Sequence, residues 1–300
     1  MPRVNIVVVT HNRFNLTRTC LESLLPTIRH RGDVVVNIVD NGSTDGSVPY
    51  LERVAAREER VTLWKLPRNM GVAVAMNLGW AAADAEYLLN LDNDVEIHKP
   101  DWLDRLLDFA VANDNAVVVG YRFCSWHETE SVVLPSGATM LKSLCCNGAL
   151  CLIPRKVHQR CGFWNEDFGK YGYTDLDYSN RATQGGFHVG YLENDDTARH
   201  LGYERDIDDV REREKLAMRT SEATGEKMYL LDKLLFDEGI RDIYVERRFL
   251  PDFSGRSVKF VVNPAYTKTI KLQQFLLKNV TYDTEGDTVK FDLSALKEMK

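Results

Sequence analysis

The sequence predicts an α/β protein whose mostly parallel central sheet is flanked by helices. Between residues 4 and 121, short runs rich in Val, Ile and Leu alternate with segments of helical periodicity. The runs are predominantly apolar, which is typical of strands buried on both faces. Strands that alternate with helices are joined by right-handed crossovers, so we expect them to lie parallel in one sheet.

Four strands and three helices alternate in the first part of the chain. Each predicted strand is an apolar run such as VNIVVVT, and each predicted helix has apolar residues three or four positions apart. In chain order the elements are strand 4–10, helix 15–28, strand 34–40, helix 45–58, strand 61–66, helix 71–83 and strand 86–91.

The middle of the chain extends this pattern. Thr174 is the expected N-cap of one helix, and Gly162 is expected to end another. In chain order we predict helix 100–113, strand 116–121, a hairpin around 135–137, an apolar segment 147–154, a short helix 155–161, helix 174–186 and strand 187–192.

The character of the sequence changes after about residue 203. Residues 204–219 are charge-dense and predict a solvated helix, 226–239 carry an apolar helical stripe, and 280–293 resemble a hairpin about Glu285-Gly286. We therefore expect one domain over residues 1–202 and a helical and hairpin extension over 203–300. The extension could be an acceptor platform, a homo-oligomer interface or a packing layer.

Bulk composition excludes some classes of protein. The chain has 300 residues, 44% of them hydrophobic, and a formal net charge of −6. This acidic balance argues against general nucleic-acid binding, which normally needs a basic face. No secretory signal pattern opens the sequence, and no apolar run approaches the roughly 18 residues of a transmembrane segment. We expect a cytoplasmic protein with six reduced cysteines, none of them in a C-x-x-C pair.

Polar clusters follow three of the predicted strands. They are Thr10-His11-Asn12, Asp40-Asn41-Gly42 and Asp92-Asn93-Asp94. Ligands of open α/β sheets bind beyond the carboxyl ends of the strands, so the three clusters are expected at one edge. Asp92 and Asp94 could cap a turn, but two residues apart on an extended segment they point the same way. Their oxygens then suit Mg²⁺ or Mn²⁺.

Further candidates are individually less informative. Asp175 and Asp177 fall in the first turn of a predicted helix, where the helix dipole alone favours acids. The aromatic, glycine-rich flank GFWNEDFGKYGY, which contains Trp164, instead suggests a loop that folds over a ligand. His200 follows a strand and a turn, and a single histidine is more often structural than a ligand.

Taken together and in order, these motifs resemble family 2 glycosyltransferases of the GT-A fold. The resemblance covers about residues 3–202 and rests on six segments. They are VVVTHNR, IVDNGSTDGS, RNMGVAVAMNLG, LLNLDNDVEI, NGALCLIPRKV and YTDLDYSNRATQGG with the later HLG.

The resemblance implies a role for each matching residue. Thr10, His11 and Asn12 would lie beside the nucleotide base, and Asp40 would contact that base, usually uracil. Asp92 would face the ribose or sugar, Asp94 would bind the metal, and His200 would be a further metal ligand. Asp175 would be the catalytic base. Asn69, Gly71 and Asn77 would border the nucleotide-sugar pocket, and Trp164, Asp177 and Arg181 would lie on the acceptor side.

Two positions depart from the family pattern. His11 stands where the family often has tyrosine, and Thr174 replaces a glutamate. The family usually has Glu-Asp-x-Asp where this chain has Thr174-Asp175-Leu176-Asp177, which weakens any inference about how the acceptor is held.

The resemblance implies metal-dependent transfer from a nucleotide sugar, with UDP as the expected nucleotide. The acceptor could be a glycan, a peptide or a small molecule. Direct attack from the face opposite the leaving group predicts inversion, and retention would need a different arrangement. The alternatives are a catalytically inactive nucleotide-sugar-binding module and a sugar-nucleotide pyrophosphorylase. The latter normally carries a basic, glycine-rich loop where this chain has THNRFN.

Overall fold

The structure is a computed structural model that describes residues 3–123, 128–203, 228–237, 239, 241–254, 258–266, 282–283 and 290–291. The helix predicted at 204–219, Cys124 and the turn of the hairpin predicted at 280–293 lie outside these residues. The two short strands of that hairpin, β14 (Tyr282–Asp283) and β15 (Lys290–Phe291), are described and pair antiparallel.

Among the described residues, nine strands form one mixed sheet in the order β3-β2-β1-β4-β9-β6-β10-β8-β7. The first four are parallel, β6 is parallel to β10, and β9 runs antiparallel between β4 and β6. This arrangement confirms the predicted α/β class. The strands are β1 (Val4–Thr10), β2 (Val34–Asp40), β3 (Val61–Lys65), β4 (Tyr87–Asp92), β6 (Val117–Tyr121), β7 (Glu130–Val133), β8 (Thr139–Lys142), β9 (Leu150–Pro154) and β10 (His188–Leu192).

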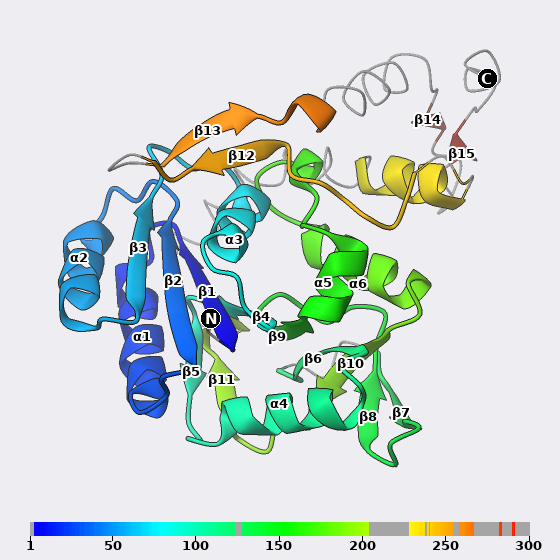
Figure 1. Cartoon of the computed structure of the whole chain (residues 1–300), viewed down its shortest axis with the longest axis horizontal. Helices are drawn as coiled ribbons and strands as arrows, with labels where there is room; N and C mark the ends of the chain where they lie inside the picture. Colours follow the sequence, from blue (N-terminus) through cyan, green and yellow to red (C-terminus); the bar gives the residue numbers. More distant parts are fainter. Residues whose placement is uncertain are drawn as a thin grey trace.

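Helices cover both faces of this sheet (Figure 1). Alternate residues of β1 show why: Val4, Ile6 and Val8 belong to one buried cluster, whereas Val7 belongs to another. The first cluster includes residues of α1 (Phe14–Ile28), α2 (Ser47–Arg57) and α4 (Trp102–Ala112). The second includes residues of α3 (Val72–Ala81), α5 (Arg155–Cys161) and α6 (Thr174–Gln184).

The start of α6 differs from the prediction. Thr174 was expected to cap this helix, but the N-cap is Tyr173, in the left-handed region at φ 60°, and Thr174 is the first helical residue. Thr174 is buried, and no side-chain hydrogen bond caps the helix. The two carboxylates of the first turn, Asp175 and Asp177, are therefore the groups placed in the favourable field of the helix dipole.

The described part of the extension lies against the main domain (Figure 1). Residues 228–237 are helical, and β12 (Phe249–Asp252) pairs antiparallel with β13 (Lys259–Val262). Val245 bridges to Gly162, donating its amide to the carbonyl of Cys161 and accepting from the amide of Phe163. The buried Glu166 carboxylate accepts hydrogen bonds from the amides of Arg248 and Phe249, at 2.9 and 3.1 Å.

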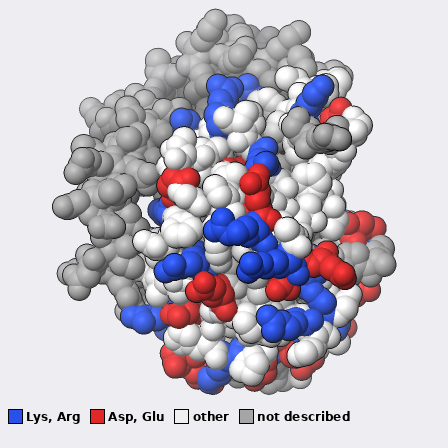
Figure 2. Space-filling model, turned by 90° about the vertical axis from the view of Figure 1, so that its left-hand side faces the viewer, with Lys and Arg blue, Asp and Glu red and all other residues white. Residues whose placement is uncertain are grey.

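Figure 2 shows the face that carries α1, α2 and β3, on which basic and acidic side chains are interspersed. Lys65 pairs with Glu52 at 2.6 Å, and Arg29 lies 4.0 Å from Glu58. Among the described helices, none combines the length and the apolar character needed to cross a bilayer.

Candidate active site

The predicted convergence of three strand ends is present. In the parallel registers of β1, Thr10 lies opposite Asp40 of β2, and Val9 lies opposite Asp92 of β4. The three polar clusters therefore share one edge of the sheet.

A small second sheet brings His200 to this edge. The chain turns after Asp92 into β5 (Val95–Ile97), which pairs antiparallel with β11 (Ala198–His200) so that His200 lies opposite Val95. His200 Nε2 consequently lies 3.5 Å from Asp94 Oδ1. One ligand atom each from Asp92, Asp94 and His200 lie within 4.8 Å of one another.

The electrostatics of this cluster fit a divalent cation. Asp94 is 4% exposed. Burial, followed by the neighbouring charge of Asp94, raises the pKa of Asp92 to about 7. Two crowded carboxylates and an imidazole nitrogen are donors that Mn²⁺ accepts readily, and Mg²⁺ shares the preference for oxygen. A cation there would offset the cost of ionising both aspartates.

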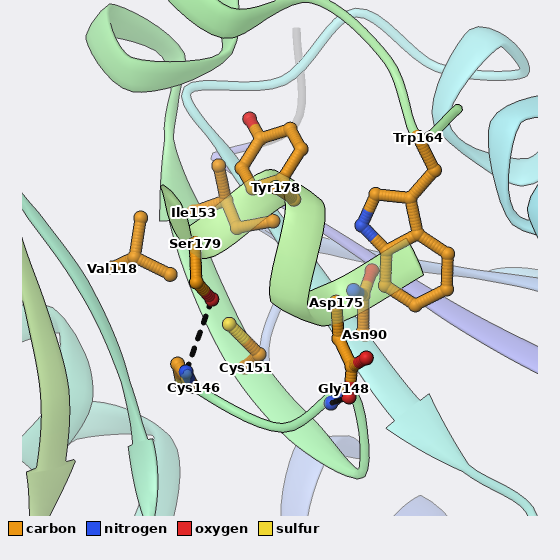
Figure 3. A pocket seen from close by; sticks show the side chains of 10 residues that line it. All are labelled: Asn90, Val118, Cys146, Gly148, Cys151, Ile153, Trp164, Asp175, Tyr178 and Ser179. Atoms are coloured by element: carbon orange, nitrogen blue, oxygen red, sulfur yellow. Dashed lines mark hydrogen bonds between the residues drawn. The ribbon is translucent and has the colours of Figure 1, made fainter. Parts of the chain in front are cut away.

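Asp175 lies at the N-terminus of α6 and lines a small cavity next to this edge (Figure 3). Its Oδ2 accepts a hydrogen bond from the amide of Gly148 at 3.3 Å, and its Oδ1 accepts from the amide of Leu176 at 2.9 Å. The cavity has room for roughly one water molecule. Trp164 forms one wall, as Figure 3 shows, so Trp164 and Asp175 line the same cavity.

Asp175 and the metal-ligand cluster are near enough to interact. The negative charge of Asp175 adds to the rise in the pKa of Asp92. Tyr171, in the loop before α6, interacts electrostatically with both Asp92 and Asp175. Burial of its hydroxyl, followed by the charges of these two aspartates, raises its pKa to about 12. The Tyr171 residue as a whole is 54% exposed. A surface aromatic side chain thus borders the space between the two carboxylate groups.

The residues expected beside the base form a second cluster. Asp40 is 2% exposed; its Oδ2 accepts from the amide of Ser43 at 3.2 Å, while its buried Oδ1 has no hydrogen-bond partner. His11 Nδ1 is also buried without a partner. Asn12 binds the following loop, its Oδ1 accepting from the amide of Thr44 at 2.9 Å. Unpaired buried polar atoms are costly, so Asp40 and His11 are suited to a ligand.

Other predicted site residues have internal partners. The Thr10 hydroxyl lies 2.8 Å from that of Thr17 and accepts from Asn93 Nδ2 at 3.1 Å. Asn77 is 1% exposed and binds the carbonyl and amide of Trp164 as well as Glu166 Oε1, at 2.9, 3.0 and 2.8 Å. The structure places these side chains in networks that support the site.

Asn69 and Gly71 lie at the start of α3. Asn69 Oδ1 accepts from the amide of Gly71 at 3.0 Å. Gly71 has φ +96°, and a Cβ there would lie 2.8 Å from the carbonyl oxygen of Gly169. Only glycine fits this close approach of the loop that leads to Tyr171.

The side chains of Asp177 and Arg181 are buried and do not line the small cavity that Asp175 borders. They form a buried ion pair of 2.7 Å at i,i+4 spacing within α6. Arg181 also donates to the carbonyls of Cys161, Phe163 and Ile243. Both side chains therefore contact the protein interior, and Arg181 also contacts the extension.

Arg13 was not among the predicted site residues. It directly follows Asn12, and its Nη1 lies 3.3 Å from Asp94 Oδ2. Its position after THN was the one available signal, since nothing in sequence spacing links residues 13 and 94.

The mixed sheet with paired carboxylates at its edge agrees with the glycosyltransferase resemblance of the sequence. The sequence matches the family model described as Glycosyl transferase family 2 over residues 5–169, more than half of the chain. The chain therefore belongs to glycosyl transferase family 2, and the predicted family is confirmed.

Curated proteins of similar sequence match shorter stretches of this chain. An uncharacterized glycosyltransferase of Haemophilus influenzae is 30% identical over 126 residues, covering 41% of this chain and 49% of the relative. The O-antigen biosynthesis protein RfbC of Myxococcus xanthus is 37% identical over 112 residues, covering 36% of this chain and 8% of the relative. The matched region thus spans half or less of the length of these relatives.

Solved structures share the fold. Mannosyltransferase PcManGT from Pyrobaculum calidifontis, in complex with GDP-Man and Mn²⁺, is similar with a TM-score of 0.53 at 20% identity. The similarity covers 64% of this chain and 55% of that one. GalNAc-T7 with UDP, GalNAc and Mn²⁺ gives a TM-score of 0.53 at 14% identity, covering 66% and 43%. These similarities confirm the GT-A fold.

Proposed function

We propose that this protein transfers a sugar from a nucleoside-diphosphate sugar to an acceptor hydroxyl with inversion at the anomeric carbon. The observation that carries the proposal is the convergence of Asp92, Asp94 and His200 at the sheet edge within electrostatic reach of Asp175. An acidic metal-ligand set beside a separate carboxylate suits a reaction that expels a diphosphate and removes a proton.

Asp40 and His11 are the residues proposed to bind the nucleotide base. Their unpartnered buried atoms, Oδ1 and Nδ1, match the need to bind the polar edge of a base. The family resemblance favours uracil, so UDP-sugars are the first donors to test. PcManGT and GalNAc-T7 were solved with GDP-Man and with UDP, respectively, so GDP-sugars belong in the same panel.

Asp92, Asp94 and His200 would hold Mn²⁺ or Mg²⁺. Such a cation shields the charge that develops on the departing diphosphate, which is worth several kcal/mol in the transition state. Asp94, buried and joined through its backbone carbonyl to the amide of Leu201, is fixed for this role. The cluster would bring the sugar-bearing end of the donor to the edge that Asp175 borders.

Asp175 is the proposed general base. Hydrogen bonds from Gly148 and Leu176 orient its carboxylate, and the small cavity that it lines can hold a hydroxyl-sized group. As the acceptor hydroxyl forms its bond to the anomeric carbon, Asp175 takes the hydroxyl proton and the carbon–diphosphate bond breaks. A positioned base contributes about 10²–10⁴-fold to such a step.

We propose that the described extension takes part in acceptor binding from residue 228 onward. Tyr229 stacks on Tyr173 with ring centroids 5.4 Å apart, and Tyr173 is the N-cap of the helix that bears Asp175. The extension therefore contacts the residue that directly precedes the helix bearing the proposed base. Loss of acceptor preference in Tyr229→Ala, with donor hydrolysis retained, is the result expected.

The test of the proposed function is a release assay. The full chain is incubated with UDP-, GDP- and dTDP-sugars in Mn²⁺, in Mg²⁺ or in EDTA, and nucleoside diphosphate is measured. Metal-dependent release from one donor, lost in Asp94→Ala but kept in the exposed control Asp108→Ala, is expected. Asp175→Asn should bind that donor normally and slow acceptor-dependent transfer by about 10²–10⁴-fold.

Two outcomes would contradict the proposal in different ways. Tight nucleotide binding without turnover against a broad acceptor panel favours the inactive binding module. Absence of binding to every nucleotide would remove the donor assignment altogether.

A further inference from the structure

We propose that Arg13 binds the diphosphate of the donor and helps to balance the charge of Asp94 before the donor arrives. The inference rests on the proposed function, since it assigns a residue to the leaving group of that reaction. Four observations carry it: the backbone of Arg13, the loop contacts that fix it, its partner and its exposure.

The backbone holds Arg13 in an uncommon conformation. Asn12 and Arg13 have φ values of 56° and 65°, two consecutive non-glycine residues in the left-handed region. Each such residue costs on the order of 1 kcal/mol, so surrounding contacts must maintain the arrangement. Strain of this kind concentrates at ligand-binding sites.

Contacts from the loop after β2 maintain it. The Asn12 amide donates to Ser43 Oγ at 2.7 Å, and the Phe14 amide donates to Asp45 Oδ2 at 3.0 Å. The Arg13 carbonyl accepts from the amide of Thr17 at 3.0 Å and so begins α1. Hydrogen bonds thus hold Arg13 on both sides, and its guanidinium can reach Asp94, 81 positions away in the sequence.

The contact with Asp94 leaves much of the guanidinium available. It joins one nitrogen, Nη1, to one carboxylate oxygen, and the Arg13 side chain is 32% exposed whereas that of Asp94 is 5% exposed. A planar guanidinium presents five donors in a fork that matches two oxygens of a phosphate. Its exposed part can therefore meet an incoming phosphate group while Nη1 still lies beside Asp94.

The negative charge of the site explains why a cation is needed at Arg13. Asp92, Asp94 and Asp175 contribute up to three negative charges, and the diphosphate of a donor brings more. Arg13 acts directly on this group, because its Nη1 lies 3.3 Å from Asp94 Oδ2. A cation that can face both a carboxylate and a phosphate allows an acidic site to accept an anionic ligand.

The experiment compares Arg13→Met and Arg13→Lys with Arg18→Met, which removes the same charge from an exposed residue of α1. Titration calorimetry measures binding of UDP and of uridine, or of GDP and guanosine if the wild type prefers them, in EDTA. We expect Arg13→Met to lose at least about tenfold in affinity for the diphosphate. Affinity for the nucleoside should stay within about twofold, and Arg13→Lys should fall between Met and wild type because it keeps the charge and loses the fork.

A second measurement uses Mn²⁺ alone. Removing the cation beside Asp94 should strengthen binding of Mn²⁺ to the nucleotide-free protein in Arg13→Met, relative to wild type and Arg18→Met. This readout needs no turnover, and thermal melting of each variant confirms that it is folded.

Three outcomes overturn the inference. Unchanged diphosphate affinity in Arg13→Met would show that the guanidinium does not meet the phosphates. Equal losses for diphosphate and nucleoside would show that Arg13 only shapes the loop. If the wild type binds none of these nucleotides in EDTA or in Mn²⁺, the proposed function fails and the inference fails with it; the first two results leave the proposed function intact.

Discussion

Glu166 and His158 are predicted to tilt the pH dependence of stability in opposite directions. Burial, offset in part by the hydrogen bond from Asn77, raises the pKa of Glu166 from 4.5 to about 7. Burial lowers the pKa of His158 from 6.5 to about 4, in a site where its ring packs edge-on against Trp80 and Phe163. Both groups favour their neutral forms in the folded protein.

The sign follows from proton binding in each state. Between pH 4.5 and 7 folded Glu166 binds more protons than unfolded Glu166, so its contribution to the free energy of unfolding falls as pH rises. Between pH 4 and 6.5 unfolded His158 binds more protons, so its contribution rises with pH. Each pKa differs from its usual value by about 2.5, and at 1.36 kcal/mol per pKa unit each group accounts for about 3 kcal/mol.

The two contributions nearly cancel in the wild type, and single substitutions should reveal them. Between pH 4 and 7.5, the free energy of unfolding of Glu166→Gln minus that of the wild type should rise by about 3 kcal/mol. The same difference for His158→Phe should fall by about as much. Urea unfolding followed by tryptophan fluorescence, at half-unit steps of pH, gives the difference curves. Other carboxylates titrate in this range, but subtraction of the wild-type curve removes them.

The result that would refute this reasoning is a Glu166→Gln curve parallel to the wild-type curve. Three donors point at Glu166, from Asn77, Arg248 and Phe249, and each favours the ionised carboxylate. Parallel curves would mean that these hydrogen bonds outweigh burial and keep Glu166 charged.

Three further predictions concern buried contacts and are measured by urea unfolding at pH 8. Gly79→Ala should cost about 1–3 kcal/mol, because a Cβ there would lie 2.3 Å from Val7 Cγ1; adding Val7→Ala should recover part of the loss, and simple additivity would contradict the packing argument. Asn77→Ala should cost about 3 kcal/mol by leaving groups of Trp164 and Glu166 unpaired, and a cost below about 1 kcal/mol would show that water replaces the amide. Arg181→Met should cost about 3–5 kcal/mol because Asp177 is left buried without its partner, whereas the exposed control Arg57→Met should be nearly neutral.

The first four strands were predictable because each is a predominantly apolar run in the local sequence. The first two, 4–10 and 34–40, match the structure at both ends, and the third and fourth differ by a residue. A strand covered by helices on both faces needs a continuous apolar run, and few other structures produce one. The convergence of Thr10, Asp40 and Asp92 followed from parallel pairing alone.

Contacts of long sequence separation were not predictable in this way. The approach of His200 to Asp94 depends on pairing between β5 and β11, which are short strands about 100 positions apart. Periodicity contains no such information, and only the family resemblance suggested it. The burial of Asp177 and Arg181 depends on the extension, whose Ile243 carbonyl accepts from Arg181. Their i,i+4 spacing was a local signal for the ion pair, but not for its depth.

The hydrogen bonds from the amides of Arg248 and Phe249 to Glu166 also form late in biosynthesis. A ribosome completes the strands and helices of the family-matched region well before it adds residues 248 and 249, so until then the Glu166 carboxylate lacks two of its donors. Asn77 of α3 donates a hydrogen bond to Glu166. The segment that contains Glu166 leads to the loop carrying Tyr171 and to the helix carrying Asp175. The sheet edge that carries Asp92 and Asp94 is therefore synthesised before the segment that completes the hydrogen bonds of Glu166.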